Sequence, residues 1–105
     1  MPCSRNDVVL LPIPFTDLSS HKVRPAIVIV LGTFPGDLFV VPLTSRLDNA
    51  DFPLADWQAA GLNVPSAAKA QLATVESRLV RKVVGRISTR DQAALDSHLR
   101  RWLSL

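Results

Sequence analysis

The chain has 105 residues, of which 48% are hydrophobic, and its 12 Lys and Arg residues outnumber 9 Asp and Glu residues to give a net charge of +3. This length corresponds to one domain, and the apolar fraction is high enough for a packed core, which excludes an intrinsically disordered chain. The basic pI of about 9.8 permits nucleic-acid binding without establishing it.

Cys3 is the single cysteine of the sequence. It cannot form a disulfide within the chain, which indicates a protein that is not built for an oxidising compartment. The first residues lack a signal-peptide pattern, and no apolar run approaches the roughly 18 residues that a transmembrane helix needs. We therefore expect a soluble, cytoplasmic protein without membrane contact.

The N-terminal part of the chain predicts one strand followed by a loop. Residues 7–11 form a β-branched and aliphatic run that is typical of a strand. Pro12 and Pro14 are expected to interrupt regular pairing there. Residues 16–22 are rich in Asp, Ser and His, which favour turns, and predict a polar loop.

A β-hairpin is expected next. Residues 26–31 are apolar at every position, as in a central strand that is buried on both faces. The sequence Gly-Thr-Phe-Pro-Gly at 32–36 predicts a turn, so residues 37–43 are expected to return beside 26–31.

The middle of the chain is more ambiguous. Residues 46–53 are expected to be irregular, and 54–60 to form a short helix or helical turn that ends at a left-handed Gly61. Residues 79–87 predict an extended segment. Residues 66–75 are rich in alanine, and by propensity they can be either helix or strand.

The last segment predicts an amphipathic helix. Thr89 is expected to be its N-cap, and Gln92 would complete a capping box. Arg100 and Arg101 lie in the last turn, where they complement the helix dipole. One apolar stripe at helical spacing comprises Leu95, Leu99, Trp102 and Leu103. The fold class is therefore mainly β with a C-terminal α-helix, in the form of a small, strongly bent antiparallel sheet or barrel.

An arginine at the start of the 26–31 strand is the main candidate for chemistry. Arg24 presents a fork of donors that suits a phosphate. The second strand ends at Thr44, Ser45 and Arg46, which add two hydroxyl donors and another guanidinium. Together they predict a site for phosphodiesters, although a surface arginine at a strand start often only covers the core with its stem.

Candidates for proton transfer are fewer. His21 has an ordinary pKa of about 6.5, which suits an acid or a base, although loop histidines are often only solvated. Asp17 is more consistent with a turn-capping role. His21 and His98 lie far apart in sequence and no carboxylate cluster accompanies them, so we expect no metal site and no cofactor. Four basic residues lie within nine positions of each other: Arg78, Arg81, Lys82 and Arg86. This cluster has two possible roles, which are to neutralise RNA phosphates or to protect an edge strand from aggregation.

Three segments in series resemble the MazF/PemK (Kid-like) toxin family of type II toxin–antitoxin systems. They are the RPA triplet at 24–26 after a polar loop, PLTSR at 42–46, and RKVVGRIS at 81–88. The resemblance covers nearly the whole chain. It implies an SH3-like small antiparallel barrel, and it favours strand over helix for residues 66–75.

The resemblance also implies an activity. Members of this family are metal-independent endoribonucleases that cleave single-stranded RNA at a short sequence by attack of the 2′-hydroxyl. Arg24 matches the family's catalytic arginine, and Thr44 matches its active-site hydroxyl residue, while His21 or Lys69 would assist proton transfer. The implied partners are single-stranded RNA, a cognate antitoxin and a second copy of the chain in a homodimer.

One pair of positions departs from the family pattern. Some members carry an arginine and an aspartate two residues apart where this chain has Lys69 and Gln71. A lysine can still contact phosphate as a point charge, but a glutamine cannot act as a base. The expected RNA-binding residues are Lys22, Ser45, Arg46, Lys69, Gln71 and Arg86.

Two alternative functions stay open at this point. One is a CcdB-like toxin that binds gyrase without catalysis, for which residues 102–105 would offer an exposed C-terminal anchor. The other is a catalytically weak RNA-binding module, for which Gln71 would be the sign of lost activity.

Overall fold

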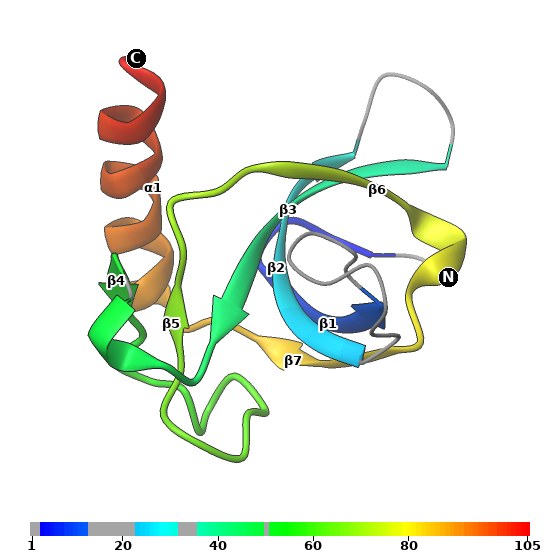
Figure 1. Ribbon diagram of the computed structural model, residues 1–105, viewed down its shortest axis with the longest axis horizontal. Coiled ribbons are helices and arrows are strands. Elements are labelled where there is room, and N and C mark those ends of the chain that lie inside the picture. The colour runs from blue at the N-terminus through cyan, green and yellow to red at the C-terminus, as the bar shows by residue number, and fades with distance from the viewer. Residues whose placement is uncertain (1–2, 13–22, 32–35, 50) are drawn as a thin grey trace.

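The computed structural model describes residues 3–12, 23–31, 36–49 and 51–105 (Figure 1). The strands are β1 (Asp7–Pro12), β2 (Val23–Leu31), β3 (Asp37–Thr44), β4 (Phe52–Pro53), β5 (Ala67–Ala68), β6 (Ala73–Glu76) and β7 (Lys82–Arg86). Two 3₁₀ turns, Leu47–Asn49 and Ser77–Leu79, and one α-helix, α1 (Thr89–Leu103), complete the described elements.

The strands form one antiparallel sheet in the order β4-β5-β3-β2-β1-β7, with β6 also paired to β3. β2 lies at the centre between β1 and β3, as its fully apolar sequence predicts. β4 and β7 stand at opposite ends of this order, so the described strands make a strongly bent sheet that is open rather than a closed, hydrogen-bonded barrel. The predicted class, mainly β with a C-terminal helix, is confirmed.

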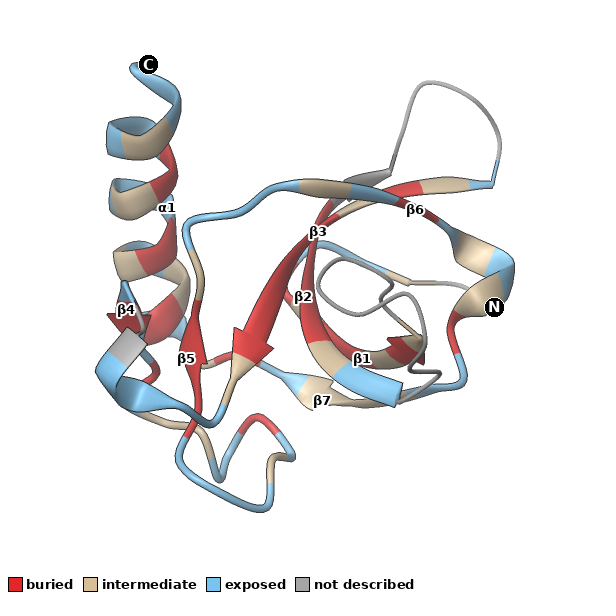
Figure 2. Ribbon diagram, viewed as in Figure 1, coloured by how far each residue is buried: buried red, intermediate tan, exposed pale blue. Residues whose placement is uncertain are grey.

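Buried residues follow one another along β2 and β3 (Figure 2), and the apolar ones belong to two separate core clusters. One face packs against α1, and its buried residues include Ile27, Val41, Leu43, Leu95 and Leu99. The other face is enclosed by the curl of the sheet itself, with Leu11, Ala26, Val28, Val40 and Val75 among its buried residues. Alternate residues of β2 and β3 therefore enter different cores, which explains why neither strand shows an apolar–polar alternation.

Three strand predictions need correction. Pro12 is the last residue of β1 and lies opposite Val23, so it ends the pairing rather than preventing it; a proline is tolerated at a strand end because no ladder N–H is needed there. The 66–75 segment is extended in part: it splits into β5 and β6, with residues 69–72 between them. The 79–87 segment likewise begins in a 3₁₀ turn before β7.

Residues 54–60 form successive turns rather than a regular helix. They end at Gly61, whose φ of 89° lies in the left-handed region, as the sequence predicts.

The start of α1 differs from the predicted capping box. Ser88, not Thr89, is the N-cap, and its Oγ accepts a hydrogen bond from the Asp91 N–H at 3.2 Å. The Gln92 side chain donates to the Ile87 carbonyl at 2.9 Å instead of reaching the cap residue's N–H. The basic last turn is as predicted, and Leu95, Leu99 and Trp102 of the apolar stripe pack on the core, whereas Leu103 is exposed.

Asp91 ties α1 to the preceding turns. Its buried carboxylate accepts hydrogen bonds from the backbone N–H groups of Ala55 and Asp56, both at 2.9 Å. A buried carboxylate is stable when N–H donors satisfy it, as these two and the helix N-terminus do. The helix therefore fixes the segment that starts at residue 54.

No helix in the described part of the chain is long and apolar enough to span a membrane. Among the same residues, no group of three or more His, Cys, Asp or Glu side chains is arranged to hold a metal ion.

Candidate functional site

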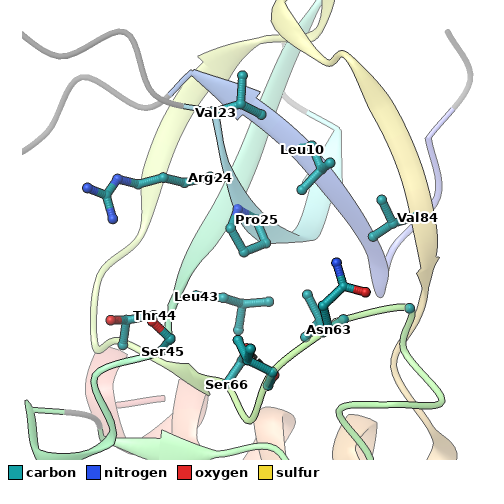
Figure 3. A pocket seen from close by; sticks show the side chains of 13 residues that line it. Leu10, Val23, Arg24, Pro25, Leu43, Thr44, Ser45, Asn63, Ser66 and Val84 are labelled. Carbon is teal, nitrogen blue, oxygen red and sulfur yellow. Dashed lines mark hydrogen bonds between the residues drawn. The ribbon is translucent and has the colours of Figure 1, made fainter.

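A pocket of about 390 Å³ opens where β2 begins and β3 ends (Figure 3). Its walls come from β1, β2, β3, β7 and the loop after Gly61. The lining residues that matter for the argument are Leu10, Arg24, Pro25, Leu43, Thr44, Ser45, Asn63, Ser66 and Val84.

The pairing of β2 with β3 explains why Arg24 and Thr44 meet at this pocket. Ala26 lies opposite Pro42 in the antiparallel ladder. The described pairing ends there, and Arg24 and Thr44 each lie two residues beyond it, so both stand at the same end of the two strands and line the pocket. In Figure 3 the Arg24 side chain extends to the side on which Thr44 and Ser45 lie.

The Thr44 hydroxyl is oriented by the backbone. Its Oγ1 accepts a hydrogen bond from the N–H of Arg46 at 3.1 Å. Because one lone pair is used in this way, the hydroxyl proton stays free to donate to a ligand in the pocket. Ser45 is exposed beside it and lines the same pocket.

The mouth of the pocket is positively charged. Arg24 is exposed, and no carboxylate of the described residues lies within ion-pair distance of it. Four other arginines, by contrast, each pair with a carboxylate: Arg5, Arg78, Arg86 and Arg90. An unneutralised guanidinium next to free hydroxyl donors is an arrangement that binds a phosphate oxygen.

The sequence did not predict that the loop after Gly61 lines the pocket. Residues 61–66 fold over its end and contribute Asn63 and Ser66. The Ser66 Oγ donates to the Val64 carbonyl at 2.9 Å, which closes the loop on itself. Gly61 and Asn63 predict a turn at this point of the chain, but nothing in the sequence indicates that the loop reaches the start of β2.

Two glycines set the position of this loop. Gly61 crosses β7 so closely that an added Cβ would overlap the carbonyl of Val84. A Cβ on Gly85 would in turn overlap the carbonyl of Ala60. The two backbones are in direct contact, and only glycine permits this at both positions.

The other predicted site residues lie outside the pocket lining. Lys69 is half-buried, and its backbone N–H donates to the carbonyl of Pro42 at 3.1 Å. Lys69 therefore lies beside β3 at Pro42, which precedes Thr44 by two residues. Gln71 is exposed in the connection between β5 and β6, and Arg46 is exposed after β3. Arg86 pairs with Asp7 at 3.3 Å across β7 and β1.

Three residues that the sequence analysis considered fall on a segment that the structure does not describe. His21, Lys22 and Asp17 lie outside the described residues. Of the described side chains that line the pocket, none is an imidazole or a carboxylate. Among the described residues, the pocket therefore offers one cationic side chain and hydroxyl donors but no ordinary acid–base side chain.

These observations define a small mainly-β protein with a pocket, lined by one guanidinium and several hydroxyl groups, at the end of two central strands. The family model described as PemK-like, MazF-like toxin of type II toxin–antitoxin system matches residues 4–103. The chain belongs to this toxin family. No curated protein sequence matches it.

Solved structures share the fold at low sequence identity. The Mycobacterium tuberculosis toxin MazF-mt6 superposes with a TM-score of 0.75 at 16% identity, covering 94% of this chain and 97% of its own. An endoribonuclease in complex with its cognate antitoxin, from a mycobacterial species, superposes with a TM-score of 0.71 at 14% sequence identity. The match covers 96% of this chain and 92% of the endoribonuclease. A further mycobacterial endoribonuclease superposes with a TM-score of 0.69 at 14% sequence identity, and the match covers 96% of this chain and 90% of that one.

Proposed function

We propose that this toxin is a metal-independent endoribonuclease that cleaves single-stranded RNA at a short sequence. The observation that supports the proposal is that Arg24, at the start of β2, and Thr44, at the end of β3, line one pocket. Family membership and the endoribonucleases among the structural relatives support it.

The reaction uses a nucleophile that the RNA supplies. The 2′-oxygen forms a bond to the adjacent phosphorus, and the bond from phosphorus to the 5′-oxygen breaks. The products are a 2′,3′-cyclic phosphate and a 5′-hydroxyl end. Arg24 binds the non-bridging oxygens and stabilises the charge that builds up on them, and Thr44 donates a hydrogen bond to the same phosphate. DNA lacks the nucleophile and stays intact.

Two protons move in this reaction. One leaves the 2′-hydroxyl, and one reaches the departing 5′-oxygen. His21 precedes Arg24 by three residues, and histidine is the side-chain type that most readily gives or takes a proton near neutral pH, so it is the first candidate for either transfer. Lys69, which lies beside β3, is the second candidate.

Basic and polar side chains outside the pocket hold the rest of the RNA. Ser45 and Arg46 extend the site directly after Thr44, and Lys69 lies along β3. Each lysine or arginine that neutralises a phosphate releases counterions, so binding weakens as salt rises. The proposed RNA-contacting residues are Lys22, Ser45, Arg46, Lys69, Gln71 and Arg86.

The protein acts with partners in the cytoplasm. One structural relative is bound to its cognate antitoxin, and by likeness an antitoxin segment would cover the pocket of this chain and block the RNA. A homodimer is the expected functional form, because a domain of 105 residues gains stability by burying more surface.

A direct test is to incubate the purified protein with a long RNA in EDTA and to analyse the fragment ends. Wild-type protein and the Arg78→Ala variant, which removes an exposed arginine paired with Glu76, should both produce cyclic-phosphate ends. Arg24→Ala should produce none. RNA that stays intact with wild-type protein, or fragments that persist at full rate with Arg24→Ala, would refute the proposed activity.

A further inference from the structure

We propose that the pocket behind Arg24 and Thr44 holds the nucleobase next to the scissile phosphate, and that Asn63 selects this base by hydrogen bonding. This inference rests on the proposed RNA cleavage. It assigns a specificity-determining role to a residue of the 61–66 loop.

The shape of the site separates phosphate from base. Arg24 and Pro25 are successive residues of β2, and Leu43 and Thr44 are successive residues of β3, so in each strand the polar and the apolar side chain point to opposite faces while all four residues line the pocket. A phosphate bound at the mouth therefore has the interior directly beside it. Figure 3 shows the guanidinium on one side of the view and the apolar lining on the other.

The interior offers apolar surface on several sides. Leu10, Pro25, Leu43, Leu62 and Val84 surround it. An unstacked RNA base exposes two apolar faces that need such contacts, because RNA recognition by sequence targets splayed-out bases whose edges are then read by hydrogen bonds.

Asn63 is suited to read that edge. In Figure 3 its side chain projects among Leu43, Leu10 and Val84, toward the pocket interior. The residue is exposed, and its carboxamide makes no hydrogen bond to any described residue. A carboxamide offers a donor and an acceptor side by side, so it can pair with a base edge through two hydrogen bonds.

The loop that carries Asn63 is held at both ends. Gly61 packs on the backbone of β7, and the Ser66 carbonyl accepts the Leu54 N–H at 3.0 Å. The buried Asp91 fixes the preceding turns. A donor–acceptor pair on a fixed loop discriminates between bases, because a wrong base leaves its groups unpaired.

Asn63→Ala tests the inference, with Gln58→Ala as the matched control on the same segment. Gln58 is exposed and does not line the pocket. Cleavage of an RNA library with random flanking bases, followed by sequencing of the ends, gives the base preference at each position. Asn63→Ala should still cleave but lose its preference at one position beside the cut, with kcat/KM for the preferred RNA reduced roughly 10- to 100-fold. Gln58→Ala should match wild type.

Binding to RNA oligonucleotides with a 2′-deoxy group at the cleavage position provides a readout that does not depend on chemistry. Wild-type protein should bind the preferred base more tightly than the other three, and Asn63→Ala should bind all four alike. Unchanged preferences in Asn63→Ala, or equal losses at every position, would overturn the role of Asn63. Wild-type protein that shows base preference in binding but leaves ordinary RNA intact would instead refute the proposed cleavage alone.

Discussion

Arg24, at the start of β2, and Thr44, at the end of β3, line the same pocket, each two residues beyond the last paired positions Ala26 and Pro42. The hairpin register therefore brings together two residues that are well separated in sequence. The backbone N–H of Arg46 then holds the Thr44 oxygen at 3.1 Å and leaves its proton available. This relationship leads to the first two predictions.

Arg24→Ala should lower kcat/KM for RNA cleavage by about 100- to 1,000-fold, the usual loss when one preorganised donor to a developing charge is removed. Arg24→Lys should restore only part of the rate, since an ammonium lacks the planar fork. Arg24 is exposed, so both variants should unfold at the same urea concentration as wild type. A loss of stability equal to the loss of activity would point to a structural role.

Thr44→Val should reduce cleavage, and Thr44→Ser should retain most of it, because the serine keeps the hydroxyl. The double variant Arg24→Ala/Thr44→Val should lose less activity than the two single losses combined, since both side chains act on one phosphate. Steady-state kinetics of the four proteins check this. Fully independent effects would place the two residues at separate sites.

Gly61→Ala and Gly85→Ala should each destabilise the fold by about 1–3 kcal/mol or more, because the added methyl meets backbone that cannot move away. Gly36→Ala is the matched control. Its φ of 92° is also left-handed, but the nearest atom to an added Cβ is the Ser77 Oγ at 3.9 Å. It should cost only about 1 kcal/mol of backbone strain. Urea unfolding measures all three, and equal losses would contradict the close crossing.

Asp91→Ala should lower the free energy of unfolding by about 2–4 kcal/mol. It leaves two partly buried N–H groups, those of Ala55 and Asp56, without an acceptor. Asp91→Asn should recover part of this loss, because one oxygen remains. Since these turns precede the Asn63 loop, the Ala variant should also lose base selectivity at temperatures below its unfolding transition. Unaltered stability would show that water replaces the carboxylate.

Stability should fall in acid through Asp56. Hydrogen bonds from Arg90, at 2.6 and 3.2 Å, and from Ser88, at 2.6 Å, lower the pKa of this carboxyl group. A lowered pKa stabilises the fold above the ordinary value of about 4 and loses that contribution as pH falls through the folded value. The stability gap between wild type and Asp56→Asn should therefore shrink between pH 7 and pH 3.

The matched control is Asp48→Asn, which changes an exposed carboxylate in the first 3₁₀ turn. Urea unfolding should show nearly the same free energy of unfolding for wild type and Asp48→Asn, at pH 7 and at pH 3. A gap for Asp56→Asn that is constant with pH would contradict the proposed ion-pair contribution.

The sequence predicted the central strands and the last helix because their signals are local. The apolar run of β2, the glycine turn before β3 and the stripe of α1 each depend on neighbours in the chain. The N-cap was wrong by one residue, because Ser88 and Thr89 offer the same hydroxyl and only the geometry at Asp91 selects between them.

The pocket was only half predictable. Arg24 and Thr44 belong to adjacent strands of a predicted hairpin, so their meeting follows from the sequence. Asn63 does not, because its loop reaches the start of β2 through the contact between Gly61 and β7. That contact joins two segments, and neither sequence indicates that the other lies beside it. Long-range backbone packing of this kind escapes propensity and periodicity.

The most direct measurement replaces the single 2′-hydroxyl at the cleavage position of a preferred RNA by hydrogen and records cleavage in EDTA. If Arg24 and Thr44 act on a phosphate that its own 2′-oxygen attacks, the modified linkage should stay intact while the RNA still binds, and the unmodified RNA should yield a cyclic phosphate. Cleavage of the modified linkage at an unchanged rate would contradict this account.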